Sequence, residues 1–158
     1  PRIEAGFPVD RQRQSLFGHS FGGLCTLYAA LTRPASFRNF LVSSPSIWFG
    51  EKRVLSFLDG FEARLAAVGA PKSLVISVGE LEQETPEKLF RIWPAYADWI
   101  RRNNMLGNLR ALEETLKGLA LPDLELIVRE IDGEHHGSAP PVAIHKAMPV
   151  ALRETAKG

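Results

Sequence analysis

The sequence alternates four times between a short apolar run and a longer segment with helical spacing. The strand-like runs lie at residues 13–20, the first part of 37–49, 72–80 and 124–133. The run at 72–80 is continuously apolar, which is typical of a strand covered on both faces. Strands that alternate with helices pair in parallel through right-handed crossovers. The sequence therefore predicts a three-layer α/β sandwich around a mostly parallel sheet.

Helical segments follow each predicted strand. They are expected at residues 21–34, 51–69 (as one or two helices), 107–121 and 140–157. Residues 83–106, which contain Pro86, Pro94 and several large aromatic side chains, are expected to be irregular. A length of 158 residues with 45% hydrophobic side chains suits one domain with its own core. We therefore assign residues 1–158 to a single domain.

Composition and charge argue against several classes of function. The chain has 19 basic and 18 acidic residues, a balance that gives no electrostatic footprint for nucleic acid or for a membrane surface. No apolar run approaches the roughly 20 residues of a membrane-spanning helix. The single cysteine, Cys25, allows neither an internal disulfide nor a cysteine metal cluster, and we expect it to be a small buried residue. With no basic-then-apolar leader at the start, these features favour a cytoplasmic protein without a metal.

Side chains that could act as a nucleophile, an acid or a base follow three of the predicted strands. Ser20 follows the first strand, Glu80 and Glu82 follow the third, and His135 and His136 follow the fourth. The carboxyl ends of parallel strands meet at one edge of a sheet, so these groups are expected to lie together. A chain order of serine, acid and histidine is that of the α/β-hydrolases. The sequence thus predicts a nucleophile, an acid and a base at one edge of the sheet.

A G-x-S-x-G pattern surrounds Ser20 at the expected strand-to-helix junction. A serine in such a sharp turn has an exposed hydroxyl and a strained backbone. Gly18 and Gly22 are expected where bulkier side chains would collide with the turn, and Gly23 where the helix packs close to the sheet. The backbone N–H of Phe21, at the helix N-terminus, would point toward an oxyanion on the substrate.

The base and the acid are chosen among several candidates. Neighbouring side chains point apart, so only one of His135 and His136 should face the serine, and we favour His136. His145 lies inside the last predicted helix and is interpreted as structural. Glu82 is favoured as the acid because it completes a glycine-x-x-acid turn after the third strand, and Glu80 remains the alternative.

Further residues are placed beside the substrate. Ser46 and Trp48 follow the second strand on the same edge, and Trp48 is expected to line a pocket. His19 directly precedes the serine and is expected to pack beneath the turn rather than to act as the base. We include Trp48, Ser46 and His19 in the predicted substrate-binding group.

Three segments together resemble the Putative esterase family of the α/β-hydrolase superfamily, which includes the siderophore trilactone esterases. They are LFGHSFGGLCTLYAALTRPASFRNFLVSSPSIWF, VGELEQ and GEHHGSAPP. The resemblance implies that Ser20 is the nucleophile and that His136 is the family histidine. It matches residues 44–48 to the family's Ser-Pro-Ser-x-Trp segment. It also implies ester hydrolysis through an acyl-enzyme, without a metal or an organic cofactor.

In that family several strands precede the nucleophile strand, whereas here this strand begins near residue 13. We therefore expect a truncated α/β-hydrolase fold that lacks the N-terminal strands. The loop that supplies the second oxyanion N–H would be missing with them. The first strand would also become an exposed sheet edge, which invites pairing with another chain. We expect a homo-oligomer formed through this edge.

Two classes of function remain open at this stage. The first is a serine carboxylic-ester hydrolase that acts on siderophore-type or other small esters through an acyl-enzyme. The second is a catalytically inactive or partner-completed hydrolase fragment that acts as an interaction module. A thioesterase or peptidase on the same machinery would differ from the first only in its acyl partner.

Overall fold

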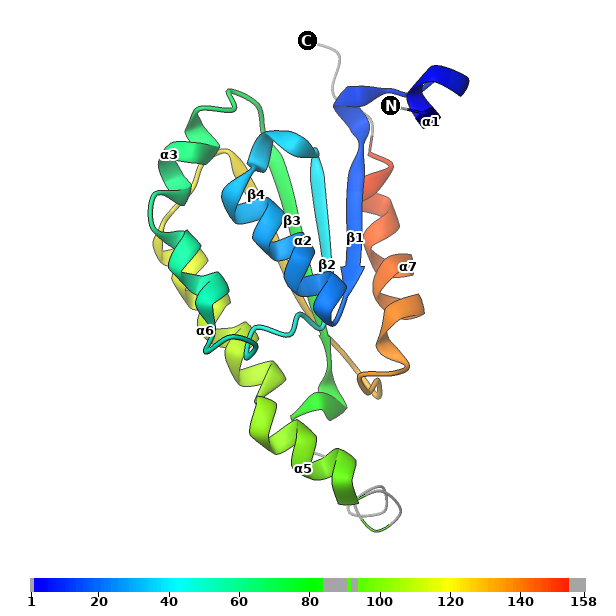
Figure 1. Ribbon diagram of the computed structural model, residues 1–158, viewed down its shortest axis with the longest axis vertical. Helices are drawn as coiled ribbons and strands as arrows, with labels where there is room; N and C mark the ends of the chain where they lie inside the picture. Colours follow the sequence, from blue (N-terminus) through cyan, green and yellow to red (C-terminus); the bar gives the residue numbers. More distant parts are fainter. Residues whose placement is uncertain (1, 84–90, 92–93, 154–158) are drawn as a thin grey trace.

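A parallel sheet of four strands forms the centre of the computed structural model, which describes residues 2–83, 91 and 94–153 (Figure 1). The strands are β1 (Ser15–His19), β2 (Asn39–Ser43), β3 (Lys72–Gly79) and β4 (Leu124–Ile131). They lie in the order β1-β2-β3-β4, and every neighbouring pair is parallel. The predicted parallel α/β arrangement is confirmed.

Helical elements connect the strands along the chain. Before β1 lie α1 (Arg2–Gly6) and the short 3-10 helix η1 (Arg11–Arg13). Between β1 and β3 lie α2 (Phe21–Thr32), η2 (Pro34–Ser36), η3 (Arg53–Leu58) and α3 (Phe61–Ala66). After β3 come η4 (Glu80–Glu82), α5 (Pro94–Asn103) and α6 (Met105–Gly118), and α7 (Ala139–Ala151) follows β4.

The segment expected to be irregular contains a helix, α5, so this prediction was wrong for residues 94–103. Pro94 is the first residue of α5 as described, and proline is tolerated in the first turn of a helix, where a missing backbone N–H leaves no helical hydrogen bond unmade. A proline in this segment is therefore compatible with a helix. Pro86 lies outside the described residues. The segment expected as one or two helices divides at Gly60, whose φ of 70° suits glycine, into η3 and α3.

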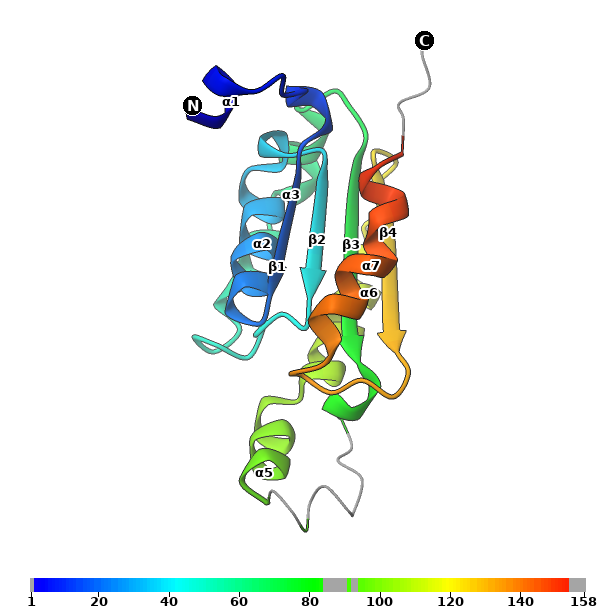
Figure 2. The ribbon, with the colours of Figure 1, turned by 90° about the vertical axis from the view of Figure 1, so that its right-hand side faces the viewer.

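Helices cover both faces of the sheet and make three layers (Figure 2). Side chains alternate between the faces along each strand, as the pleat requires. Phe40 and Val42 of β2 join the larger core with α2, α3 and α6, whereas Leu41 joins a smaller cluster beneath α7. The expected three-layer sandwich is confirmed.

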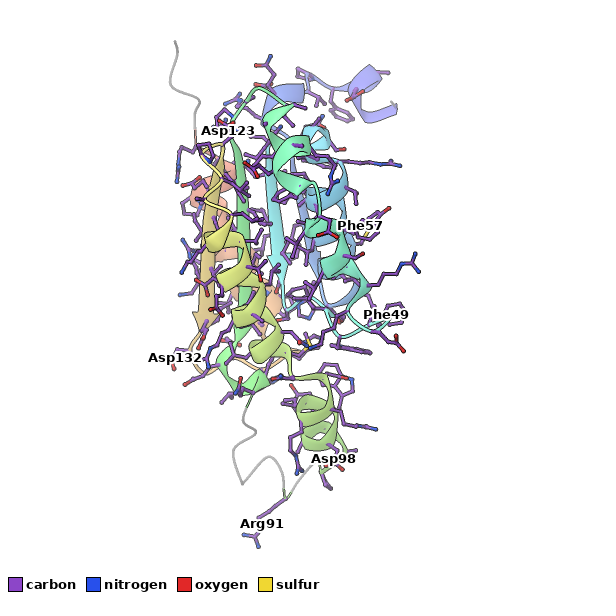
Figure 3. The ribbon with its side chains drawn as sticks, turned by 90° about the vertical axis from the view of Figure 1, so that its left-hand side faces the viewer. Phe49, Phe57, Arg91, Asp98, Asp123 and Asp132 are labelled. Atoms are coloured by element: carbon purple, nitrogen blue, oxygen red, sulfur yellow. The ribbon has the colours of Figure 1, made fainter. Side chains whose placement is uncertain are left out.

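All four strands point toward the same end of the molecule. In Figure 3, Asp123 marks the start of β4, while Asp132, just after β4, and Phe49, in the loop after β2, lie toward its far end. Helix α5, labelled at Asp98, projects beyond this end of the sheet. The loops that follow the strands and the inner end of α5 therefore meet in one region.

Cys25 is exposed, so the expectation of a buried residue was wrong. The buried side of α2 consists of Gly23, Thr26, Leu27, Ala30 and Leu31. A spacing of four residues brings Cys25 above Phe21 on the opposite, solvent-facing side of the helix, where Phe21 is also exposed. Among the residues that the structure describes, no helix is long and apolar enough to cross a membrane.

The two edges of the sheet differ in charge. The edge strand β4 carries Glu125, Arg129 and Glu130, and charged side chains discourage the addition of another strand. The edge strand β1 has the sequence Ser-Leu-Phe-Gly-His and no acidic side chain, lysine or arginine. The β1 edge is therefore the less protected of the two.

We predict that the chain self-associates through β1 and that a lysine placed on this strand weakens the association. Ser15→Lys adds a charge at an exposed position of β1. Light scattering after gel filtration should give a mass above that of one chain for the wild type and a smaller mass for this variant. Thr115→Lys adds the same charge on α6, over the opposite part of the sheet, and should leave the mass unchanged. A monomeric wild type would contradict the prediction.

Candidate active site

Ser20 occupies a strained turn between β1 and α2, with φ 58° and ψ −117°. Such a backbone conformation costs a non-glycine residue on the order of 1–3 kcal/mol. A Cβ on Gly18 would lie 2.1 Å from the carbonyl oxygen of Gly22, and one on Gly23 would lie 2.6 Å from that of Ser43. A Cβ on Gly22 itself would meet open space, so the expected collision there was wrong. Close packing thus requires glycine at two positions of the turn.

His136 lies against the hydroxyl of Ser20. Its Nε2 is 3.0 Å from the serine Oγ, although the two residues are 116 positions apart in the chain. His136 comes from the loop between β4 and α7, and its backbone N–H donates to the hydroxyl of Tyr96 over 3.1 Å. Its ring packs against those of His19 and Trp99, with centroid distances of 4.6 and 4.9 Å. Three neighbouring residues therefore contact the histidine.

Glu82 contacts the other nitrogen of the same ring. Its Oε2 lies 2.8 Å from His136 Nδ1, and the Glu82 side chain is fully buried. A carboxylate only accepts hydrogen bonds, so Nδ1 carries the proton and Nε2 is free to accept from Ser20. Glu80, the alternative acid, instead accepts a hydrogen bond from the backbone N–H of Gly133. The structure thus brings Ser20, His136 and Glu82 together and leaves Glu80 aside.

The other histidines do not contact the serine hydroxyl. His135 Nδ1 accepts from the backbone N–H of Gly137 at 3.0 Å, and its ring lies near Tyr96. His145 is exposed on α7. His19 Nδ1 is 3.0 Å from Ser43 Oγ, so this side chain is tied to the end of β2 beneath the turn.

Ser46 and the aromatic residues complete the surroundings of Ser20. Ser46 Oγ lies 3.3 Å from Ser20 Oγ, and its backbone N–H donates to the Ser20 carbonyl. The ring of Trp48 packs edge-on against those of Phe21 and Trp99. Its indole N–H is buried without a hydrogen-bond partner among the described residues. Phe21 begins α2, which places its backbone N–H directly after the serine.

Sequence reasoning did not assign Tyr96 and Trp99 to the site. The two rings stack at an interplanar angle of 11° on α5 and reach His136. Their spacing of three residues places them on one helix face, but this signal required α5 to be recognised as a helix. Ser44, whose hydroxyl donates to Glu82, was likewise given no role of its own.

Burial controls the charge state of the groups around His136. Burial, followed by the neighbouring His136, lowers the pKa of His19 below its usual value. Burial also raises the pKa of the Tyr96 hydroxyl, which stays protonated while it accepts the His136 N–H. His19 therefore remains neutral beside the His136 ring. No group of three His, Cys, Asp or Glu side chains in the described part of the chain could hold a metal ion.

Residues 1–106 match the family described as "Putative esterase". The chain belongs to this family. Over 152 residues it is 32% identical to the ferri-bacillibactin esterase BesA of Bacillus subtilis, with 96% of this chain and 47% of that protein covered. Over 153 residues it is 33% identical to the siderophore triacetylfusarinine C esterase of Aspergillus fumigatus, with 94% and 52% covered.

The fold of this family member is also found in solved structures. The crystal structure of the BES protein from Bacillus cereus aligns with a TM-score of 0.81 and 28% sequence identity, over 98% of this chain and 52% of that one. The expected partial α/β-hydrolase fold is confirmed. The chain spans about half the length of the curated relatives it matches, 47% and 52% for the two named above. Its assignment as one domain stays a prediction.

We predict that His19 makes the stability of the fold depend on pH. Its folded-state pKa lies below the ordinary value of 6.5, so the unfolded chain binds more protons as the pH falls through that value. The free energy of unfolding should therefore decrease from about pH 7 to about pH 5, and His19→Gln should reduce this decrease. Urea denaturation of the wild type and the variant at both pH values measures this change in the free energy of unfolding.

The control for this prediction is His145→Gln, which removes an exposed histidine on α7. It should keep the pH dependence of the wild type. An unchanged dependence in His19→Gln would show that burial of this ring does not penalise its protonation.

Proposed function

We propose that this protein is a serine carboxylic-ester hydrolase that works through an acyl-enzyme. The observation that carries the proposal is the continuous contact of Ser20 Oγ, His136 and Glu82, at 3.0 and 2.8 Å. A free serine hydroxyl is a poor nucleophile at neutral pH and needs an adjacent base. A buried acid behind the base fixes the tautomer in which Nε2 can accept the serine proton. The esterase relatives support the same reaction.

In the acylation step, Ser20 Oγ attacks the carbonyl carbon of the ester and its proton passes to His136 Nε2. The tetrahedral intermediate collapses, the bond from carbon to the alcohol oxygen breaks, and the alcohol leaves with the proton from Nε2. Glu82 stabilises the imidazolium that exists between these transfers. The products of this step are an alcohol and an acyl ester on Ser20.

In the deacylation step, water replaces the alcohol. The water gives a proton to His136 Nε2 as its oxygen attacks the acyl carbon, and the bond from that carbon to Ser20 Oγ then breaks. The serine oxygen recovers the proton from Nε2, and the carboxylic acid leaves. The cycle ends with the enzyme groups as they began, so the net reaction is hydrolysis by one water molecule and needs no cofactor.

The negative charge that develops on the carbonyl oxygen needs hydrogen-bond donors. The Phe21 N–H, at the start of α2, is the donor that we assign within this chain. Hydrolases of this fold take a second N–H from a loop that precedes the nucleophile strand. One missing donor lowers the rate by about 10²- to 10³-fold.

The substrate class is proposed from the relatives and from the side chains near Ser20. Two matched proteins are named as esterases of siderophores, ferri-bacillibactin and triacetylfusarinine C. Phe21, Trp48 and Trp99 form a connected aromatic group beside the serine and His136. Such a group suits small esters with planar or apolar portions. We propose siderophore-type or other small esters as substrates, in a cytoplasmic setting.

A second candidate function is a partner-completed or inactive module. It is favoured by the uncharged β1 edge and by the chain's match to about half of each relative. The two candidates share the geometry at Ser20 and differ in turnover. A phosphonate probe that labels Ser20 in a chain without turnover would favour the module, because the nucleophile would be formed and the oxyanion site incomplete.

We predict that Ser20→Ala abolishes hydrolysis of short p-nitrophenyl esters. Removal of the attacking oxygen should lower kcat by at least about 10³-fold, because no other group forms the acyl-enzyme. Ser36→Ala, an exposed serine before β2, is the matched control and should keep wild-type turnover. Turnover that survives in Ser20→Ala would contradict a serine mechanism.

We predict that Glu82→Gln and Glu80→Gln have very different effects. The amide introduced by Glu82→Gln would favour the wrong tautomer of His136, so kcat should fall by about 10³- to 10⁴-fold. Glu80 accepts its hydrogen bond from Gly133, away from the ring, and its replacement should change kcat by less than about threefold. Ester hydrolysis by the two purified variants measures the difference. Equal losses would show that the buried position of Glu82 gives it no special role.

A further inference from the structure

Ser44 lies at the end of β2 in an unusual backbone conformation. Its φ of 42° falls in the left-handed region, which glycine adopts freely and serine rarely does. Its backbone N–H donates to the carbonyl of Ser77 over 2.7 Å, which fixes the residue against β3. The side chain is fully buried. Bulk solvent therefore does not reach the Ser44 hydroxyl.

The Ser44 hydroxyl donates to Oε1 of Glu82 over 2.5 Å. The same oxygen accepts the backbone N–H of Gly79 over 2.9 Å. The other oxygen, Oε2, faces His136 Nδ1. Two donors from different strand ends thus hold one carboxylate oxygen and leave the second directed at the histidine.

We propose that Ser44 is a positioning residue that holds the Glu82 carboxylate in place, with Oε2 aimed at His136. This inference rests on the proposed function, because it concerns the acid of the same reaction. The Ser44 hydroxyl bonds to Glu82 and to neither Ser20 nor His136, so it acts through the acid. Its effect should therefore appear in the chemical step and not in substrate binding.

A fully buried carboxylate needs hydrogen-bond donors in place of water. A carboxylate only accepts hydrogen bonds, so Oε2 held at His136 Nδ1 keeps the ring proton on that nitrogen. If the carboxylate turned away, the ring proton could sit on Nε2 instead, and that tautomer cannot accept from Ser20. By fixing Oε1, the Ser44 hydroxyl keeps Oε2 at Nδ1 and the histidine in the form that the reaction requires.

The backbone conformation supports this role. If the turn after β2 had only to be formed, glycine would suit residue 44 better than serine. A serine held at φ 42°, with its hydroxyl on a buried carboxylate, has a conformational cost that the hydrogen bond offsets. This backbone strain, beside the proposed catalytic acid Glu82, sets Ser44 apart from the other buried serines.

The test compares Ser44→Gly and Ser44→Ala with the wild-type chain. Glycine removes the hydroxyl and relieves the backbone, whereas alanine removes the hydroxyl and keeps the strain. Both variants should lower kcat for p-nitrophenyl esters by about 10- to 100-fold, the value of a lost hydrogen bond to a charged group, with KM unchanged. Ser44→Gly should unfold at the higher temperature of the two, which separates fold stability from activity.

A spectroscopic measurement tests the same point without turnover. The His136 Nδ1–H proton, hydrogen-bonded to Glu82, should give a low-field proton resonance in the wild type, assigned by its loss in His136→Gln. It should broaden or disappear in both Ser44 variants. Ser77→Ala is the matched control, since this buried serine on β3 donates to the Val42 carbonyl and not to Glu82. It should keep the resonance and the wild-type kcat.

The outcomes separate the two proposals. If Ser44→Gly keeps both the wild-type kcat and the resonance while Ser20→Ala is inactive, the role of Ser44 is overturned and the esterase mechanism stands. If Ser20→Ala hydrolyses esters as the wild type does, the proposed function is overturned instead. In a wild-type chain without turnover, the resonance alone decides: its persistence in Ser44→Gly overturns the inference.

Discussion

The close approach of α2 to the ends of β1 and β2 is the constraint on which the site depends. At Gly18 and Gly23 there is no room for a single methyl group, because backbone atoms of α2 and β2 lie within 2.1 and 2.6 Å of where it would sit. This contact forces the chain to reverse from strand to helix within one residue, Ser20, and the serine takes up the resulting strain. The backbone packing at these glycines thus positions the Ser20 hydroxyl independently of the side chains around it.

The remaining groups are arranged in order of burial. Ser44 and Glu82 are fully buried, His136 is partly buried, and the aromatic rings of Phe21 and Phe49 are open to solvent. Hydrogen bonds run from the buried end to Ser20 through His136. The Glu82 carboxylate is therefore remote from bulk solvent, where hydrogen bonds to it are strong, and the Ser20 hydroxyl, the proposed nucleophile, lies at the other end of this series of hydrogen bonds.

Sequence reasoning located the strands, their parallel pairing and the loops that meet at their carboxyl ends, because buried parallel strands have an apolar pattern with few alternatives. It favoured His136, which the structure places beside Ser20, and Glu82, which the structure places against the His136 ring. It did not find α5, since two prolines suggested an interruption, and it therefore left Tyr96 and Trp99 without a place. It also misplaced Cys25, because a small apolar residue fits either side of a helix that has exposed Phe21 and Tyr28.

The order of the strands has a consequence for how such a site can be assembled. Ser20 follows the edge strand β1, whereas Glu82 and His136 follow β3 and β4 on the far side of the sheet. A strand added at the uncharged edge would lie next to the serine and leave the acid and the histidine untouched. In the proposed mechanism, the groups that transfer the proton therefore follow β3 and β4, whereas a strand added at β1 would change only the side of the sheet where the oxyanion would be stabilised.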